Sequence, residues 1–576
     1  MKGVFGKILN INLTSKIIEE ENIPDDIYRN YLGGKGLGAY LLLKKNPAGV
    51  NPLSPDNNII FAVGPACGFK IWGANRYGAF TKSPLTGIFS ESYAGGKAFL
   101  QFSRIGYDAV VINGACERWS YIVINNEKVE YKKADFLLGK DSLETELILK
   151  EKYKGLNPAV LTIGPAGENL VKYAYVNNDQ GRSLGRTGIG AILGSKKVKA
   201  IVVMGNIKKE AADPQLLSSY AKEQLEIGRQ HPGTKAYNKT GTSLVVDLTT
   251  AVDAFPARYW QQGSVPHRDK INAEALHREL DVKPKACLYC FIACTRSSTV
   301  KYGRHKGLKL DGPEYETIDA FGGLNMVDDI KEIAFLNDIC DRLGLDTVTA
   351  GNTTAFAIEA YKRGKIDFEI DYGEVDRIAE LLRMISVREG IGDLLAEGVR
   401  SASIKLGMED IAIHVKGLEP PGYDPRTLQG MGLGYAVSDR GACHLRATFY
   451  KAELSGQIDP LENNGKAKLF LEYEDRLTIY DTLILCRFFR DLLYYDELAT
   501  IVKSSMGIEL EEKDFKEISD RIAHSIRMFN LREGMDPSQD WLPEYFFKNP
   551  IGAKNIVLNR DKFGELIGDY YKLRGF

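Results

Sequence analysis

Three cysteines stand close together near the middle of the 576-residue chain, at Cys287, Cys290 and Cys294. Their C-x2-C-x3-C spacing lets three thiolates hold three irons of one cubane, while a fourth ligand comes from elsewhere. Structural zinc, the main competitor, usually takes a second C-x2-C arm or a nearby histidine. No second C-x2-C occurs, and the next histidine downstream, His305, lies eleven residues beyond Cys294. The spacing therefore favours an iron–sulfur cluster, with zinc and a chance grouping as the alternatives.

The fourth ligand of such a cluster has five candidates elsewhere in the chain, which are Cys67, Cys116, Cys340, Cys443 and Cys486. Local sequence does not choose among them, because most buried lone cysteines act as small hydrophobic side chains. Eight cysteines are too few for a disulfide scaffold in a chain this long. Three of them within eight residues indicate metal binding in a reducing compartment.

A loop rich in glycine and arginine, GRSLGRTGIGAILG at 181–194, is the second candidate for chemistry. Glycines let a backbone approach a ligand closely, and Arg182 and Arg186 supply forked donors for phosphate. The spacing matches neither the dinucleotide fingerprint nor a phosphate-binding loop with its lysine. Glycine-rich turns are common in β domains, but similar loops at 33–38 and 94–97 favour an extended cofactor that carries phosphate.

The elements that must position these residues change in type near residue 205. Before it, Leu9, Ile11 and Leu13 alternate with asparagines, and Asn125-Asn126 indicates a hairpin turn. Further apolar runs predict strands at 58–64, 108–114, 121–131, 159–164 and 199–205. After it, helical periodicity predicts helices at 328–343, 375–399, 466–500 and 512–532.

We therefore expect an α+β protein in which a β-rich N-terminal domain, residues 1–205, precedes two mainly α-helical domains, residues 206–410 and 411–576. The formal net charge of −1 gives no reason to expect a nucleic-acid partner. The sequence has no secretory signal and no apolar run of membrane-spanning length. We expect a soluble cytoplasmic protein without a membrane partner.

Motifs along nearly the whole chain resemble the aldehyde:ferredoxin oxidoreductase family of tungsten enzymes. Between GKILNINL near the start and YYKLRGF at the end they include NRYGAFTKSPLTG (75–87), IGPAGENLVKYA (163–174), GPEYET (312–317), DRLGLD (341–346), YDPRTLQGMGLGYA (423–436) and RGACHLRA (440–447). The resemblance implies an N-terminal β domain that forms a base for the cofactor, with two mainly helical domains above it. It also implies tungsten, or molybdenum, held by the dithiolenes of two pterins, together with one 4Fe–4S cluster and Mg²⁺ between the pterin phosphates.

The resemblance assigns cofactor contacts residue by residue. Contacts to the pterin phosphates and their magnesium fall on Arg76, Tyr93, Gly95, Arg182, Ser183, Gly185 and Arg186, and further contacts fall on Arg440, Gly441 and Arg446. Tyr93 replaces an asparagine of the family pattern, which is harmless if the contact is a backbone carbonyl.

The pterins themselves are recognised in this family by a repeated motif, D-x-x-G-L followed by Asp or Cys. The first copy supplies Asp341, Leu345 and Asp346 as contacts, and the second copy supplies Asp481 and Leu485. Carboxylates suit a pterin because its amino and ring N–H groups are donors.

The second copy ends in Cys486, which the resemblance makes the fourth ligand of the cluster beside Cys287, Cys290 and Cys294. Ile484 stands in this copy where glycine is expected, and a β-branched residue resists positive φ. We therefore expect the helix at this position to continue through Cys486.

The resemblance places Glu316 and His444 beside the metal, with Tyr423 as a third member of the catalytic set. Without it, His444 and Tyr423 would be structural residues, and Glu314 would be a solvated loop residue. A carboxylate can deprotonate water or a hydrated aldehyde, and histidine can hydrogen-bond the carbonyl oxygen or relay the proton. The implied reaction oxidises a small aldehyde to a carboxylic acid, with ferredoxin or a ferredoxin-like subunit as electron acceptor.

Two other functions stay open. A tungsten subunit that reduces aromatic-ring thioesters shares the cofactor motifs, and a non-catalytic iron–sulfur electron carrier would share the cysteines.

The chain is expected to work as a homodimer or in a hetero-oligomer. Some family dimers hold iron between subunits through a glutamate and a histidine. Phe335 stands at that glutamate position and no histidine lies between His305 and His414, so we expect no such metal.

Overall fold

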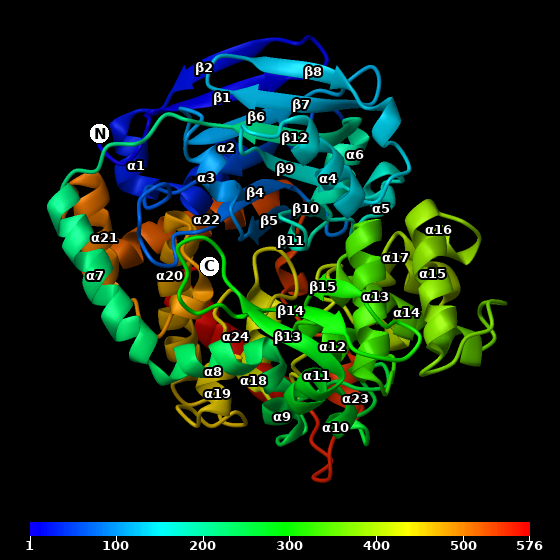
Figure 1. Cartoon of the computed structure of the whole chain (residues 1–576). Coiled ribbons are helices and arrows are strands. Elements are labelled where there is room, and N and C mark those ends of the chain that lie inside the picture. The colour runs from blue at the N-terminus through cyan, green and yellow to red at the C-terminus, as the bar shows by residue number, and fades with distance from the viewer.

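The computed structural model describes residues 1–576, and its N-terminal third contains two six-stranded sheets (Figure 1). The first has the order β2-β1-β6-β3-β4-β5, with β1 (Lys7–Asn12), β2 (Ile18–Asn22), β3 (Ile59–Ala62), β4 (Tyr77–Lys82), β5 (Phe89–Ala94) and β6 (Ala109–Asn113). The second has the order β11-β10-β9-β12-β7-β8, with β7 (Ser120–Asn125), β8 (Val129–Lys133), β9 (Ala159–Ile163), β10 (Val176–Asn178), β11 (Arg182–Leu184) and β12 (Val198–Met204).

Both sheets are mixed, and they share one hydrophobic core. β1 pairs in parallel with β6, and β12 pairs in parallel with β7, while their other neighbours are antiparallel. Leu9 and Ile11 of β1 belong to a cluster of 31 buried hydrophobic residues that also draws Ile122 from β7 and Ile201 from β12. The alternation of apolar residues in β1 and the hairpin between β7 and β8 are therefore confirmed.

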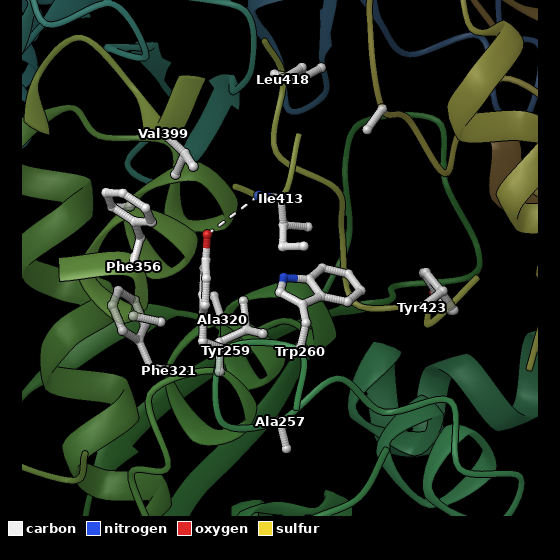
Figure 2. Close-up of a cluster of buried hydrophobic side chains, with 14 of the residues drawn as sticks. Ala257, Tyr259, Trp260, Ala320, Phe321, Phe356, Val399, Ile413, Leu418 and Tyr423 are labelled. Atoms are coloured by element: carbon white, nitrogen blue, oxygen red, sulfur yellow. Dashed lines mark hydrogen bonds between the residues drawn. The ribbon is translucent and has the colours of Figure 1, made fainter. Parts of the chain in front are cut away.

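The rest of the chain is mainly helical, so the predicted α+β class is confirmed. The long helices are α7 (Pro214–Gln230), α13 (Ile330–Leu343), α14 (Thr347–Lys362), α15 (Val375–Val387), α20 (Lys466–Leu483), α21 (Tyr495–Met506), α22 (Glu512–Arg532) and α24 (Arg560–Arg574). Their core is a cluster of 76 buried hydrophobic residues. Figure 2 shows part of it, where Trp260 neighbours Tyr259, whose hydroxyl accepts a hydrogen bond from Ile413 N at 3.4 Å. No helix is long and apolar enough to cross a membrane.

A small antiparallel sheet interrupts the helical part and was not predicted. It consists of β13 (Leu280–Lys285), β14 (Thr295–Val300) and β15 (Lys309–Asp311), in that order. The loop between β13 and β14 carries Cys287, Cys290 and Cys294. The sheet therefore fixes both ends of the cysteine loop.

The two copies of the predicted pterin motif end two helices with the same backbone geometry. Gly344 caps α13 at φ 79° and ψ 44°, and Ile484 caps α20 at φ 65° and ψ 41°. The next residue in each case bonds back into the helix, Leu345 N to Cys340 O at 2.9 Å and Leu485 N to Tyr480 O at 2.7 Å. This is the Schellman pattern of a helix C-terminus. The expectation that the helix continues through Cys486 is therefore wrong.

Tertiary packing explains why Ile484 accepts a left-handed conformation. Its side chain is completely buried, and that burial is worth about 1.5–3 kcal/mol, against a left-handed cost of roughly 1–2 kcal/mol. Glycines of the β domain lie directly on both helix ends. A Cβ on Gly34 would stand 2.3 Å from Asp481 O, and a Cβ on Gly164 would stand 2.3 Å from Leu343 O.

The long helices predicted at 328–343 and 512–532 are confirmed as α13 and α22. The one predicted at 375–399 is broken into α15 and α16 (Ile391–Leu395), because Arg388 adopts the left-handed conformation with φ 56°. The one predicted at 466–500 is broken into α20 and α21 by the turn at Ile484. The domain boundary near residue 410 stays a prediction.

Candidate active site

One cavity of about 380 Å³ is lined by residues of the β domain and of the helical part. Short elements near it are α12 (Tyr315–Ile318), α19 (Tyr450–Leu454) and the 3-10 helix η5 (Arg487–Phe489). Fourteen of the predicted site residues line the cavity, and they are Arg76, Tyr93, Gly95, Arg182, Ser183, Gly185, Arg186, Cys294, Glu316, Tyr423, Arg440, His444, Asp481 and Leu485. Segments far apart in the sequence thus meet at one place.

The remaining predicted residues lie around this cavity without lining it. Asp341 lines a separate pocket together with Asp338, and Arg446 lines a small third one with Lys35. The others outside the lining are Leu345, Asp346, Gly441, Cys287, Cys290 and Cys486. Burial raises the pKa of Asp341 to about 8, and the Tyr175 hydroxyl donates to its Oδ1 at 3.0 Å.

The cysteine loop and Cys486 are joined through Gly73. Cys486 N donates to Gly73 O at 2.8 Å, and Gly73 N donates to Tyr289 O at 3.0 Å. Burial raises the pKa of the Cys290 thiol to about 12, and Cys486 and Cys287 add to this shift. The four predicted ligands therefore lie close enough to influence one another electrostatically. No three His, Cys, Asp or Glu side chains anywhere in the chain converge tightly enough to hold a single metal ion.

Arg76 connects the cysteines to the cavity. Its Nη2 donates to Cys486 Sγ at 3.2 Å, and its side chain also lines the cavity. Burial opposes the charge of Arg76, but Cys486, Cys287 and Cys294 hold its pKa above the ordinary value. Gly95 lets the Cys287 thiol lie close to the backbone of the β domain, because a Cβ at this position would stand 3.0 Å from Cys287 Sγ.

Glu316 and His444 form the central pair of the cavity. Nε2 of His444 lies 3.4 Å from Oε1 of Glu316, and Gly422 N donates to Oε2 of Glu316 at 2.9 Å. Burial raises the pKa of Glu316 to about 7. Burial, reinforced by Arg186, lowers the pKa of His444 well below its usual value. The pair therefore offers a carboxyl group that titrates near neutrality and an imidazole that stays uncharged.

Aromatic rings wall the cavity beside this pair. The ring of Tyr423 stacks on Tyr450 with centroids 4.3 Å apart, and its centroid is 5.8 Å from that of His444. The ring centroid of Tyr315 lies 5.2 Å from that of Tyr423. Such a wall excludes water and strengthens the electrostatic interactions inside the cavity.

Glu314 also lines the cavity but in a different environment from Glu316. It accepts a hydrogen bond from the Thr242 hydroxyl, and burial raises its pKa while Arg182 and Arg296 oppose that shift. It contributes to raising the pKa of Cys294. Glu314 is thus a half-buried residue on the cysteine side of the cavity, and not the solvated loop residue expected from its local sequence.

The predicted phosphate-binding arginines differ in how fully the protein engages them. All three side-chain nitrogens of Arg186 donate hydrogen bonds within the protein. Nε donates to Asp346 at 3.0 Å, Nη1 to Ala442 O at 3.1 Å and Nη2 to Glu419 O at 2.7 Å. Arg440 donates to Glu91 O and, at 2.9 Å, to Cys443 Sγ, but its buried Nε has no partner. Arg440 therefore keeps a donor for a ligand, whereas Arg186 holds neighbouring segments together.

The region around Asp481 is a dense network of buried charges. Arg446 and Arg487 both form ion pairs with Oδ2 of Asp481, and Arg446 also pairs with Glu91. Lys35 pairs with Glu91 at 3.2 Å. The Nε of Arg446 is buried without a hydrogen-bond partner.

Two family models match the chain. The model described as aldehyde ferredoxin oxidoreductase, N-terminal domain, matches residues 8–205, and the model described as aldehyde ferredoxin oxidoreductase, domains 2 and 3, matches residues 219–576. The chain belongs to the aldehyde ferredoxin oxidoreductase family. It is therefore a member of a family of oxidoreductase enzymes, and the resemblance found in its sequence motifs is confirmed.

Relatives within the aldehyde ferredoxin oxidoreductase family are similar over their whole length. The chain is 34% identical to a tungsten-containing aldehyde ferredoxin oxidoreductase of Pyrococcus furiosus, covering 100% of this chain and 97% of the relative. It is 33% identical to that of Thermococcus kodakarensis with the same coverage. It is 27% identical to an aliphatic sulfonate oxidoreductase subunit of Pyrococcus furiosus, covering 99% and 94% of the two chains.

The fold of the family is also found in a solved structure, the active-site complex of a benzoyl coenzyme A reductase with 1,5-dienoyl-CoA. The TM-score is 0.85 at 23% identity, with 100% of this chain and 95% of that chain covered. This likeness shows a shared fold.

Several residues of this family member line the cavity although the sequence did not assign them to the site. They are Ser92, Gly181, Tyr237, Thr242, Val245, Thr295, Glu314, Tyr315, Val348, Leu445, Thr448, Tyr450, Arg487, Phe488 and Arg490. The one signal in the sequence was the pair of arginines just after Cys486, at 487 and 490.

At the position expected to lack an interface metal, the ring of Phe335 stacks on His305 at 4.1 Å, and His305 Nε2 lies 2.9 Å from Glu332. The predicted absence of that metal stays a prediction.

Proposed function

We propose that this chain oxidises aldehydes to carboxylic acids at a tungsten bis-pterin centre and passes the electrons out through one 4Fe–4S cluster. The observation that carries the proposal is the partly buried Glu316–His444 pair, which faces the same cavity as Cys294 and the predicted cofactor contacts. The full-length similarity to tungsten-containing relatives supports the choice of metal.

The residues present fit such a cofactor. Buried donors without partners, among them the Nε atoms of Arg440 and Arg446, are what a phosphate-bearing ligand would satisfy. The cysteines at 287, 290, 294 and 486 would hold the cluster, and Asp341 and Asp481 would face the two pterins. When bound, the tungsten centre would accept both electrons of the oxidation and the cluster would release them one at a time.

The chemistry at the substrate falls to Glu316 and His444. Oxidation of an aldehyde takes one oxygen from water and releases two electrons and two protons. The Glu316 carboxylate accepts a proton from the water or from the aldehyde hydrate, as a general base near neutrality does. Neutral His444 donates from a ring nitrogen to the carbonyl oxygen, and Tyr423 limits the space beside it.

The electrons leave toward a basic groove beside the cysteine loop. Lys97, Lys150, Lys154 and Lys285 line this groove of about 710 Å³ together with Leu288 and Asp179. Lys97 forms no ion pair, whereas the other three lysines pair with nearby carboxylates. Leu288 N donates to Gly96 O at 3.1 Å, and Gly96 N donates to Cys287 Sγ at 3.2 Å. A small acidic one-electron carrier such as ferredoxin has the complementary charge, and complementary charge mainly raises the rate of association.

Elemental analysis of anaerobically purified protein tests the proposal. We expect about one tungsten and about four irons for each chain, with no stoichiometric zinc. Zinc in place of iron, or iron without tungsten or molybdenum, would instead support a scaffold or electron carrier without catalysis. Molybdenum in place of tungsten would correct the metal and leave the residue roles as proposed.

A further inference from the structure

Arg490 is a buried guanidinium in the wall of the active-site cavity. It follows η5 directly, its residue is 2% exposed, and it lines the same cavity as Glu316 and Tyr423. A buried charge is costly unless hydrogen bonds or an opposite charge compensate it. The partners of Arg490 therefore decide what this residue is for.

The protein compensates this charge without an ion pair and leaves one of its donors unpaired. Nη1 donates to Arg487 O at 3.0 Å, while the buried Nε has no partner. Its sequence neighbour Asp491 helps to keep the pKa of Arg490 above its ordinary value but forms its ion pair with Lys451. Arg186 and Arg487, which line the same cavity, pair with Asp346 and Asp481, whereas Arg490 makes no ion pair.

Aromatic side chains surround Arg490. The Cζ atom of Arg490 is 6.0 Å from the centroid of Phe488, and the Phe488 ring is 4.7 Å from that of Tyr237 in an edge-on arrangement. Tyr237 and Tyr450 are neighbours of the guanidinium, and Tyr450 also stacks on Tyr423. The guanidinium thus lies on the aromatic side of the cavity, which is the side that continues to Tyr423 and the Glu316–His444 pair.

We propose that Arg490 binds a carboxylate carried by the substrate, so that the preferred substrates are aldehydes with a second, anionic end. A planar guanidinium with free donors matches a carboxylate through two parallel hydrogen bonds. The bound carboxylate takes no part in the oxidation. It orients the aldehyde end toward Glu316 and His444. This inference rests on the proposed aldehyde oxidation.

The kinetic test compares 4-oxobutanoate, which has a terminal carboxylate, with butanal, which has the same chain length and no charge. We expect wild-type kcat/KM to favour 4-oxobutanoate. In Arg490→Gln, kcat/KM for 4-oxobutanoate should fall about 10- to 100-fold, the range of a charge-assisted hydrogen bond, while butanal changes less than about 3-fold. Arg490→Lys should recover part of the loss because it keeps the charge without the fork. Equal losses on both aldehydes, or no loss on 4-oxobutanoate, would overturn the proposal.

A binding measurement gives a readout that needs no turnover. Calorimetric titration with succinate, the expected product, should show weaker binding to Arg490→Gln than to wild type, at unchanged tungsten and iron content. Loss of tungsten from this variant would make Arg490 a cofactor residue and would also overturn the proposal. If wild type oxidises neither aldehyde yet binds succinate through Arg490, the aldehyde function fails while the carboxylate site stands.

Discussion

Nε2 of His444 and Oε1 of Glu316 lie 3.4 Å apart, although 128 residues separate them in the chain. Burial shifts their pKa values in opposite directions, raising that of Glu316 to about 7 and lowering that of His444. Both shifts favour the uncharged forms. One of the two groups can therefore exchange a proton near pH 7 while the other stays a neutral hydrogen-bond partner.

Replacing Glu316 tests its role as base. Glu316→Gln should keep the tungsten and iron content, because the residue binds neither metal, while turnover falls roughly 10²–10⁴-fold. Both kcat and kcat/KM should fall, since the interaction matters mainly in the transition state. An artificial one-electron dye should report the same loss as ferredoxin, which separates chemistry from docking.

The matched control for this variant is Glu314→Gln, two residues away in the same cavity. Glu314 lies on the cysteine side and hydrogen-bonds Thr242, so its amide should leave turnover within a few-fold of wild type. If Glu314→Gln is the inactive variant instead, the wrong carboxylate has been assigned. If neither variant loses activity, the mechanism is wrong.

The pH dependence follows from the raised pKa of Glu316. The base form exists above this pKa, so kcat/KM should rise with increasing pH through about 7 and then level off. His444 should add no second limb, because its lowered pKa keeps it neutral across this range. The residual activity of Glu316→Gln should lack the rise. A rise that persists unchanged in this variant would assign the titration to another group.

The cluster assignment is tested at Cys486. Cys486→Ser should lose the cluster or convert it to a three-iron form, because three thiolates remain. The measurement is iron content with low-temperature electron paramagnetic resonance of the reduced protein. Cys116→Ser, a change at another buried cysteine outside the group around Gly73, is the control and should keep the cluster. An unchanged cluster in Cys486→Ser would move the fourth ligand to another residue.

Electron exit through the basic groove predicts a charge effect on ferredoxin alone. Lys97→Glu and Lys154→Glu reverse exposed charges at the groove, where Lys97 forms no ion pair and Lys154 pairs with the exposed Glu151. The KM for ferredoxin should therefore rise several-fold at low salt while dye reduction stays unchanged. The difference should shrink as salt screens the charges. Lys513→Glu, on α22, is the control. An equal effect from this control would show a dependence on net charge and contradict a docking site at the groove.

Patterns with local causes were predictable from the sequence. The apolar stripe of α13, the whole of α22 and the alternation in β1 all follow from side-chain periodicity. The turn at Ile484 was not predictable in this way. Its left-handed conformation depends on burial of its side chain and on contact with Gly34, which lies some 450 residues earlier in the chain.

The same limit applies to the site: its residue types were predictable from motifs, but the contacts between distant segments were not. Motif resemblance led to Glu316, His444 and most of the arginines that line the cavity. It did not show that Arg186 is fully engaged by the protein while Arg490 is not, because those hydrogen bonds join residues distant in the sequence. It also missed the sheet of β13 to β15, because Pro284 argues against a strand in β13 and because β14 and β15 carry few apolar residues.

The most direct measurement of the central claim is product identification with metal-loaded protein under anaerobic conditions. The protein is supplied in parallel with benzaldehyde plus an oxidised one-electron dye and with benzoyl-CoA plus a strongly reduced dye. If the chain oxidises aldehydes, benzaldehyde yields benzoate with oxygen from labelled water in the new carboxyl group, and no dienoyl thioester forms. Formation of the dienoyl thioester without benzoate would contradict aldehyde oxidation and would assign the chain to aromatic thioester reduction.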